Sequence, residues 1–302
     1  MIEDIKQLLN FRFDTKYLNF SSWKYADELS EQYIYSTLNT FPDVFKFFKI
    51  VVHSQGTYIN DELPTNHVLC NPSKLRNLVD IVKKCDNNFD YLVVAGRDDK
   101  LGKLEKHIKK IKHRFRKIYY EAKNVGCDYI QTIPMGLNVS YLLRNGGNKI
   151  LNTINNPKNK TKLIGCAFGS RWPELNRKVR DRKYLHKFTK NTKLVENFFC
   201  DPTEYYDNLV KYKFFASPLG NGIQTPKICE SILCETIPVV TDHVAHRELR
   251  DLYDLPLLIV NEWTDISSEF LNDAWQTKYK NTNWKEQKSK FLVDNFVDFY
   301  LS

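Results

Sequence analysis

Apolar and polar positions follow two patterns along the chain, and these patterns predict its secondary structure. Apolar runs bounded by polar residues are typical of strands in a parallel sheet, and apolar positions three or four residues apart are typical of helices. The first half contains a helical pattern at 73–84 and strand candidates at 48–53, 67–71 and 91–95. The second half contains strand candidates, separated by helical stretches, at 162–168, 193–199, 213–217, 237–241 and 257–261. This alternation predicts an α/β protein.

A polar segment divides the pattern into two blocks. Residues 152–162 read NTINNPKNKTK, and such a polar, proline-containing stretch is common in linkers. We therefore predict two Rossmann-like, doubly wound lobes, an N-terminal lobe at 1–155 and a C-terminal lobe at 156–280. The closing segment, 281–302, has aromatic residues near a helical period, which predicts a C-terminal helix.

The turn after the strand candidate at 213–217 has the composition of a phosphate-binding site. Ser217, Gly220 and Gly222 punctuate it, and glycines without a Cβ let main-chain N–H groups approach a bulky anion. Asn221 and Ile223 complete the turn. The pattern predicts that a diphosphate binds there.

The helix after this turn, expected at 225–234, carries a cation and a carboxylate on one face. Thr225 is its predicted N-cap, and Lys227 and Glu230 are three residues apart. In the functional interpretation, Lys227 meets phosphate charge and Glu230 accepts hydrogen bonds from ribose hydroxyls. The alternative is an ordinary solvated ion pair.

The order and spacing of these motifs resemble the exostosin-like glycosyltransferases over about residues 160 to 275. The matching parts are the turn Ser217 to Ile223, Glu230, the strand Ile237 to Val240 and the run Leu255 to Ile266. The resemblance implies a two-lobed GT-B fold with the donor cleft between the lobes and a nucleotide sugar held by the second lobe. It also implies inversion at the anomeric carbon and a C-terminal helix that packs back on the first lobe.

Several positions depart from the family pattern. Leu219 stands where the family usually has arginine, and Glu235 stands where it usually has glycine. Gln224 and Lys227 replace an aspartate and an arginine. Lys227 keeps one positive charge but lacks the bidentate fork of an arginine.

A second group of cations follows the strand candidate at 162–168. Arg171 lies in the turn and Arg177 in the next helical stretch, where guanidinium groups would stabilise the charge that develops on a leaving diphosphate. For Arg177 the alternative is the solvated side of a helix. No Asp-x-Asp occurs in the chain, so we expect metal independence, with a UDP-sugar as co-substrate and no further cofactor. His243 and His246 lack a third ligand and are expected to be a surface pair.

An inverting transfer needs a base, and in a two-lobed enzyme it should come from the first lobe. Asp98 and Asp99 follow the strand candidate at 91–95, and His53 ends the first strand candidate. The alternatives are that the aspartates cap a helix and that the histidine is structural. The residues alone do not decide among the three candidates.

The chain carries a net charge of +9, which suits an anionic partner. The densest basic run, 100–117, has Leu104, Ile108 and Ile111 at helical spacing and is expected to be a solvated amphipathic helix. Aromatic residues do not interleave it as a base-stacking platform requires, so we expect no nucleic-acid partner.

No apolar run reaches the ~20 residues of a membrane span, and the first residues do not resemble a signal peptide. Seven scattered cysteines without a Cys-x-x-Cys pair are typical of reduced thiols. We therefore expect a cytoplasmic protein.

These features together predict an inverting, metal-independent glycosyltransferase that moves a sugar from a UDP-sugar to a hydroxyl of a glycan. Relatives use xylose, galactose, glucuronic acid or N-acetylglucosamine, and xylose is the sugar we expect here. The competing hypothesis is a non-catalytic protein that binds a nucleotide or a glycan on a degenerate transferase fold, as the substitutions at Leu219, Gln224 and Glu235 suggest.

Overall fold

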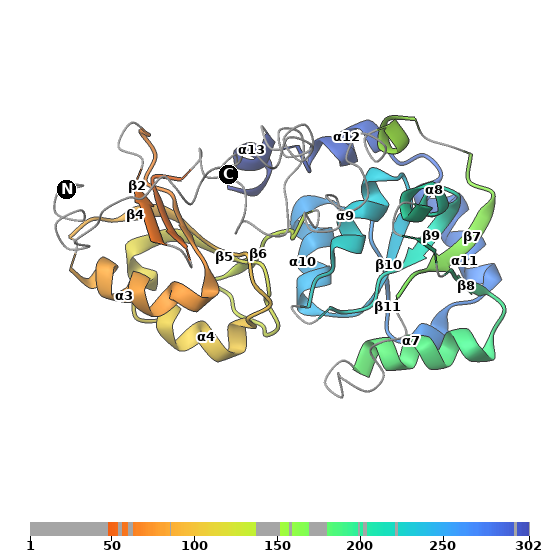
Figure 1. The fold of residues 1–302 in the computed structure, drawn as a ribbon, viewed down its shortest axis with the longest axis horizontal. Helices are drawn as coiled ribbons and strands as arrows, with labels where there is room; N and C mark the ends of the chain where they lie inside the picture. The colour runs from red at the N-terminus through yellow and green to blue at the C-terminus, as the bar shows by residue number, and fades with distance from the viewer. Residues whose placement is uncertain are drawn as a thin grey trace.

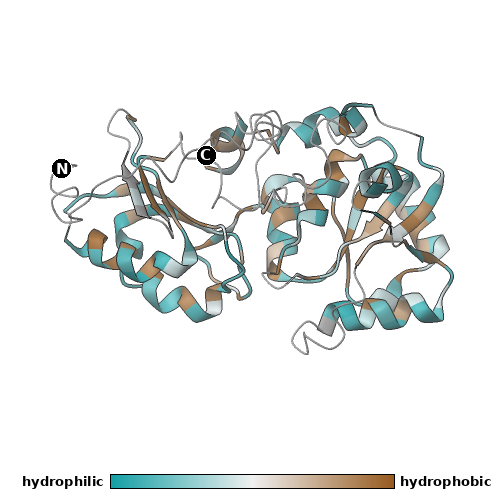
Figure 2. Ribbon diagram, viewed as in Figure 1, coloured by the Kyte–Doolittle hydropathy of each residue, from teal (hydrophilic) through white to brown (hydrophobic). Residues whose placement is uncertain are grey.

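Two α/β lobes lie side by side in the computed structural model of the chain (Figure 1). Apolar residues concentrate in the strands and on the inner faces of the helices, and hydrophilic residues cover the outer faces (Figure 2). No described helix combines the length and the apolar character needed to span a bilayer. The structure describes residues 48–53, 56–59, 63–84, 86–136, 152–156, 159–168, 180–198, 200–201, 204–220, 223–292 and 295–301.

The first lobe is built on a six-stranded sheet with the order β2-β1-β3-β4-β5-β6. Its strands are β1 Ile50–His53, β2 Gly56–Ile59, β3 Val68–Cys70, β4 Phe89–Val94, β5 Phe115–Tyr120 and β6 Gln131–Thr132. β2 is antiparallel to β1, and the other pairs are parallel. The parallel strands follow one another in a single direction, so the described part of this sheet does not show the reversal expected of a doubly wound lobe.

The helices of the first lobe pack against one face of its sheet (Figure 1). They are η3 Pro72–Lys74, α3 Leu75–Lys83, α4 Leu101–Ile108 and η4 Lys112–Arg114. The single helix expected over 100–117 is wrong, because α4 ends at Ile108 and β5 begins at Phe115. The basic residues of this stretch obscured the apolar pattern of strand β5. Its residues Ile118, Tyr119 and Tyr120 are buried, and the strand lies between β4 and β6.

The second lobe has a five-stranded parallel sheet with the order β11-β10-β9-β7-β8. Its strands are β7 Lys162–Cys166, β8 Val195–Asn197, β9 Tyr212–Ala216, β10 Ile237–Thr241 and β11 Leu258–Val260. Numbered along the chain this order is 2-1-3-4-5, which reverses once, between β7 and β9, as in a doubly wound sheet. Its helices are α7 Arg180–Asn191, α8 Tyr205–Leu209, α9 Pro226–Leu233, α10 Val244–Tyr253, η6 Trp263–Asp265, α11 Ser268–Ala274 and the π-helix η7 Trp275–Tyr279.

Helix α9 begins and ends at residues whose local chemistry explains its bounds. The Thr225 side chain accepts a hydrogen bond from the Lys227 amide, and Pro226 occupies the first helical position. At the other end Glu235 has a φ of 57°, and the amides of Glu235 and Thr236 donate to Ile232 and Ser231. This is a Schellman ending, which usually has glycine at the Glu235 position. Here the residue is Glu235, and its carboxylate forms an ion pair with the Lys288 ammonium at 2.7 Å.

The C-terminal segment forms α12 Trp284–Ser289 and α13 Phe296–Tyr300. The ring centroid of Phe296 lies 6.2 Å from that of Phe48 in the first lobe, and that of Tyr300 lies 4.9 Å from Tyr253 in the second. Helix α13 therefore contacts both lobes. The described cysteines are all free, and Cys229 and Cys234 are buried around α9.

The expected linker is attached to the second lobe. The Nζ atom of Lys160 donates to the carbonyls of Val210 and Cys234 and to the Thr236 hydroxyl, at 2.6 to 2.9 Å. Thr153 donates to the Asp207 carboxylate at 3.2 Å. The segment therefore bonds to the second lobe already at Thr153, before the predicted start of that lobe at residue 156.

Two side chains of the second lobe, Gln224 and the partly exposed Glu248, hold the lobes together. Gln224 is 3% exposed; its Nε2 donates to the carbonyls of Glu121 and Ile133 at 2.7 and 2.8 Å, and its Oε1 accepts from the Met135 amide at 3.0 Å. Glu248 accepts from the Thr132 amide at 2.8 Å and from the Lys123 ammonium at 2.5 Å. Every bond of these two side chains named here crosses from one lobe to the other.

Replacing the Gln224 amide by a carboxylate of the same shape should destabilise the protein. Gln224→Glu keeps an acceptor for the Met135 amide, but it removes two buried donors and points a carboxylate at two carbonyls. We expect a loss of about 2–4 kcal/mol in the free energy of unfolding, measured by urea denaturation. Gln276→Glu, on an exposed part of η7, is the matched control and should change it little. Equal stability of both variants would contradict the bridging role.

Candidate functional site

The strand order places the candidate site where β7 and β9 end. In a sheet of this order, ligands bind beyond the carboxyl ends of the strands, at the point where the order reverses. The turn that contains Ser217 and Gly220 leaves β9 at that point. Asn221 and Gly222 lie outside the described residues, as do Arg171 and Arg177 in the segment after β7.

The described amides of this turn bond to the protein itself. Ser217 N donates to Val239 O at 2.8 Å, and Leu219 N donates to Asp181 Oδ2 at 2.7 Å. The amides of Gly220 and Ile223 donate to each other's carbonyls at 3.0 and 3.3 Å. In this conformation these four N–H groups are therefore not open to a diphosphate, in contrast to the expectation of bare amides.

The tight backbone of the turn is sufficient to explain why Gly220 is a glycine, and no bound ligand is needed to explain it. A Cβ on Gly220 would lie 2.6 Å from the Gln224 carbonyl oxygen, which is closer than real Cβ atoms come. Ile223 adopts a φ of 80°, a costly value for a β-branched residue. Gly220 is required because the chain folds back on itself here.

Lys227 and Glu230 lie together, but not as a solvated pair. Glu230 is 4% exposed; burial raises its pKa, while the Lys227 charge and the hydroxyls of Tyr205 and Tyr206 lower it. The Lys227 ammonium lies 4.6 Å from the centre of the Tyr205 ring, and burial lowers its pKa while Glu230 raises it. The solvated ion pair is therefore wrong, and a ribose would have to displace aromatic side chains to reach Glu230.

Two residues at the start of α7 belong to the site although the sequence did not single them out. Asp181 accepts from the Leu219 amide and, at 2.6 Å, from the Trp263 indole, so it ties α7 to the turn after β9. Arg182 Nε donates to the Leu219 carbonyl at 3.3 Å. Its charge lowers the pKa of Lys227, which places two cations within electrostatic range at the switch point.

Asp98 of the first lobe lies within electrostatic range of Arg182 in the second. Partial burial and the neighbouring Asp99 raise the pKa of Asp98, and Arg182 of the second lobe lowers it. Asp99 instead pairs with Arg97 at 3.6 Å. Neither aspartate caps α4, whose N-cap is Lys100 without a side-chain bond. The capping alternative is therefore wrong, and the two candidate bases face different surroundings.

The remaining candidates have other surroundings. The backbone of His53 ends β1, and its side chain lies outside the described part. His246 is fully buried with Nδ1 2.8 Å from Thr241 O, so the expected surface pair is wrong; burial lowers its pKa to about 4. His243 caps α10 by accepting from the Ala245 amide at 3.2 Å. Within the described ranges, no three carboxylate, imidazole or thiol side chains form a metal-binding group.

A buried acid beside the site also escaped the sequence analysis. Glu121 follows β5, is 3% exposed and accepts from the Gly96 amide at 2.6 Å. Burial raises its pKa to about 8, the Gly96 hydrogen bond opposes the shift and the Asp98 charge adds to it. Glu121 is therefore largely protonated at neutral pH, next to the carbonyl that Gln224 binds.

The raised pKa of Glu121 predicts a specific pH dependence of stability. Between its ordinary pKa of 4.5 and its folded pKa of about 8, the folded protein keeps a proton that the unfolded chain has released. This contribution is complete below the lower value and is lost as the pH rises to the upper one. Glu121→Gln keeps an acceptor for Gly96 but cannot ionise. We expect its free energy of unfolding, from urea denaturation, to fall less than that of the wild type between about pH 5.5 and about pH 8.

The exposed variant Glu269→Gln controls for the loss of a carboxylate elsewhere and should keep the wild-type slope. Identical slopes for Glu121→Gln and the wild type would contradict a neutral, buried Glu121.

Comparison of the chain with known proteins adds no family to these observations. No protein-family model matches it, and no curated protein matches it significantly.

Proposed function

We propose that the protein is a glycosyltransferase that transfers a sugar from a UDP-sugar to a hydroxyl group of a glycan, with inversion. In this proposal the two α/β lobes form a GT-B enzyme, the second lobe binds the donor and the first lobe binds the acceptor. The proposal draws on the exostosin-like motifs between Ser217 and Ile266 and on the site at the end of β9.

One observation carries the proposal: near the switch point of the second sheet, the charge of Arg182 lowers the pKa of Asp98 in the first lobe, and the charge of Asp98 raises the pKa of Arg182. An inverting displacement needs a base and a cation on opposite sides of the reacting carbon. The base must lie on the acceptor side of the anomeric carbon, and the cation must lie on the side of the leaving group.

The proposed chemistry uses side chains where the sequence suggested amides. Arg182 and Lys227 hold the diphosphate, because the described amides of the turn are engaged within the protein. Asp98 accepts the proton of the acceptor hydroxyl as its oxygen attacks the anomeric carbon. The bond from that carbon to the UDP oxygen breaks, and the two cations stabilise the charge left on UDP. Glu230 positions the Lys227 ammonium.

The second candidate function, nucleotide or glycan binding without catalysis, also has an observation in its favour. Gln224, at a position where the resembled family has aspartate, is fully engaged between the lobes and offers no group to a donor. Turnover separates the two candidates.

Removing the guanidinium of Arg182 should weaken nucleotide binding. A hydrogen bond to a charged group contributes about 1.5–3 kcal/mol, so Arg182→Ala should raise the Kd for UDP at least about tenfold in isothermal titration calorimetry. Lys183→Ala is the matched control, because it removes an exposed cation from the next position of the same helix. The donor site would be contradicted if the wild-type protein does not bind UDP, or if both variants lose UDP affinity equally.

Asp98→Asn should abolish turnover but not donor binding. We expect release of free UDP, from UDP-xylose and the other three donors, to fall by about 10²–10⁴, the usual contribution of a general base. The Kd for UDP should stay within a few-fold of the wild type, because the base contacts the acceptor. Asp128→Asn, an exposed change in the same lobe, should have no effect on either quantity. UDP bound without turnover of any donor would favour the binding protein.

A further inference from the structure

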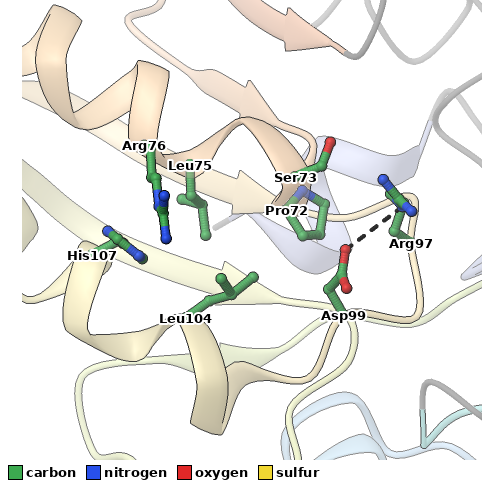
Figure 3. A pocket seen from close by; sticks show the side chains of 8 residues that line it. All are labelled: Pro72, Ser73, Leu75, Arg76, Arg97, Asp99, Leu104 and His107. Atoms are coloured by element: carbon green, nitrogen blue, oxygen red, sulfur yellow. Dashed lines mark ion pairs between the residues drawn. The ribbon is translucent and has the colours of Figure 1, made fainter.

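A cavity of about 320 Å³ opens in the first lobe, between the ends of β3 and β4 and the helices that follow them (Figure 3). Pro72 and Leu75 line it from the α3 side, Leu104 and His107 from α4, and Asp99 from the loop after β4. Its volume is at the small end of ligand pockets, about 300–1,000 Å³, which suits a single ring-sized group. The proposed donor site does not use it.

Basic side chains surround the cavity. Arg76 and His107 approach one another on one side, and Arg97 lies on the other side (Figure 3). Arg97 is 53% exposed and reaches Asp99 only at 3.6 Å, so its guanidinium keeps donors for a ligand. Two guanidinium groups on opposite sides of one small cavity are suited to a carboxylate, sulfate or phosphate group.

The rest of the lining suits a sugar ring. Pro72, Leu75 and Leu104 provide an apolar surface for the C–H face of a pyranose. The Asp99 carboxylate, 45% exposed, can accept hydrogen bonds from ring hydroxyls. An isolated inorganic anion would use the arginines but would gain nothing from the apolar surface or from Asp99.

The outer surface of α4 extends the positive charge beyond the cavity. Lys103, Lys106, Lys109 and Lys110 are exposed along and just after this helix. Such a surface attracts a chain that carries further negative groups, and its attraction weakens as salt is added.

We propose that this cavity binds an anionic sugar unit, such as a uronic acid or a sugar carrying sulfate or phosphate, of the glycan acceptor. That the sugar belongs to the acceptor rests on the proposed function. That the cavity binds an anionic sugar rests on the cavity alone. Asp99, a candidate base in the sequence, becomes a residue that recognises the acceptor.

Paired small probes test the assignment on the full chain. Methyl β-D-glucuronide should bind in a calorimetric or NMR titration at low salt, and methyl β-D-glucoside, the same ring without the charge, should bind at least about tenfold more weakly, which is about 1.4 kcal/mol. Inorganic sulfate should also bind more weakly than the glucuronide. Equal binding of glucuronide and glucoside would overturn the anionic group, and equal binding of glucuronide and sulfate would overturn the sugar.

Charge-matched variants locate the site. R76Q/R97Q should lose glucuronide binding at least about tenfold, whereas K83Q/K84Q, which removes two exposed cations outside the cavity lining, should bind nearly as the wild type. Equal losses would mean general electrostatic attraction and would overturn the proposal. A short single-stranded oligonucleotide that binds more tightly than a uronate oligomer of the same charge would overturn the glycan in favour of a nucleic acid.

The outcome is separable from that of the proposed function. R76Q/R97Q should keep the wild-type Kd for UDP, because these arginines line a cavity of the first lobe and no described residue of the turn after β9 lines it. Glucuronide binding without UDP binding would leave the cavity assigned and the transferase rejected. UDP binding and turnover without glucuronide binding would reject the cavity alone.

Discussion

The geometry of the candidate site depends on one buried amide, that of Gln224. This side chain belongs to the residue that links the turn after β9 to α9, yet its three hydrogen bonds all go to backbone groups of the first lobe. It thereby holds the switch point of the second sheet against the ends of β5 and β6. The charge of Arg182 acts on Asp98 across this junction. A residue at position 224 that could only accept hydrogen bonds would leave the Glu121 and Ile133 carbonyls without the bonds that Gln224 donates.

Buried lysines outside the candidate site are compensated by surrounding oxygens, whereas buried acids near the site have raised pKa values. Lys123 and Lys290 are buried, and carbonyl and carboxylate oxygens surround their ammonium groups. Such compensated charges join segments that are distant in the chain. Burial raises the pKa of both Glu121 and Glu230. Perturbed acids of this kind cluster at functional sites. The backbone carbonyl of Glu121 accepts from Gln224, and Glu230 interacts with Lys227.

The sequence pattern predicted the fold where apolar runs were uninterrupted and failed where charges interrupted them. All strand candidates of the second half are strands, and the Thr225 cap is confirmed. Strand β5 was not predicted because Arg116 and Lys117 interrupt its apolar run. Arg182 and Glu121 escaped for a different reason: neither belongs to a motif, and only the packing of the lobes gives each its importance. The strand-end rule selected Asp98, and its role as a base stays a prediction.

The turn after β9 shows why a glycine motif is ambiguous evidence for a phosphate site. Glycine permits a close approach to the backbone, but at Gly220 the group that approaches is the protein's own Gln224 carbonyl. The described amides of the turn donate hydrogen bonds within the protein and are not open to a ligand in this conformation. Cationic side chains differ, because Arg182 and Lys227 repel one another and an anion between them relieves that repulsion. In the proposed function the diphosphate is therefore held by these two cations and not by the glycine turn, and only folding brings Arg182 within electrostatic range of Lys227.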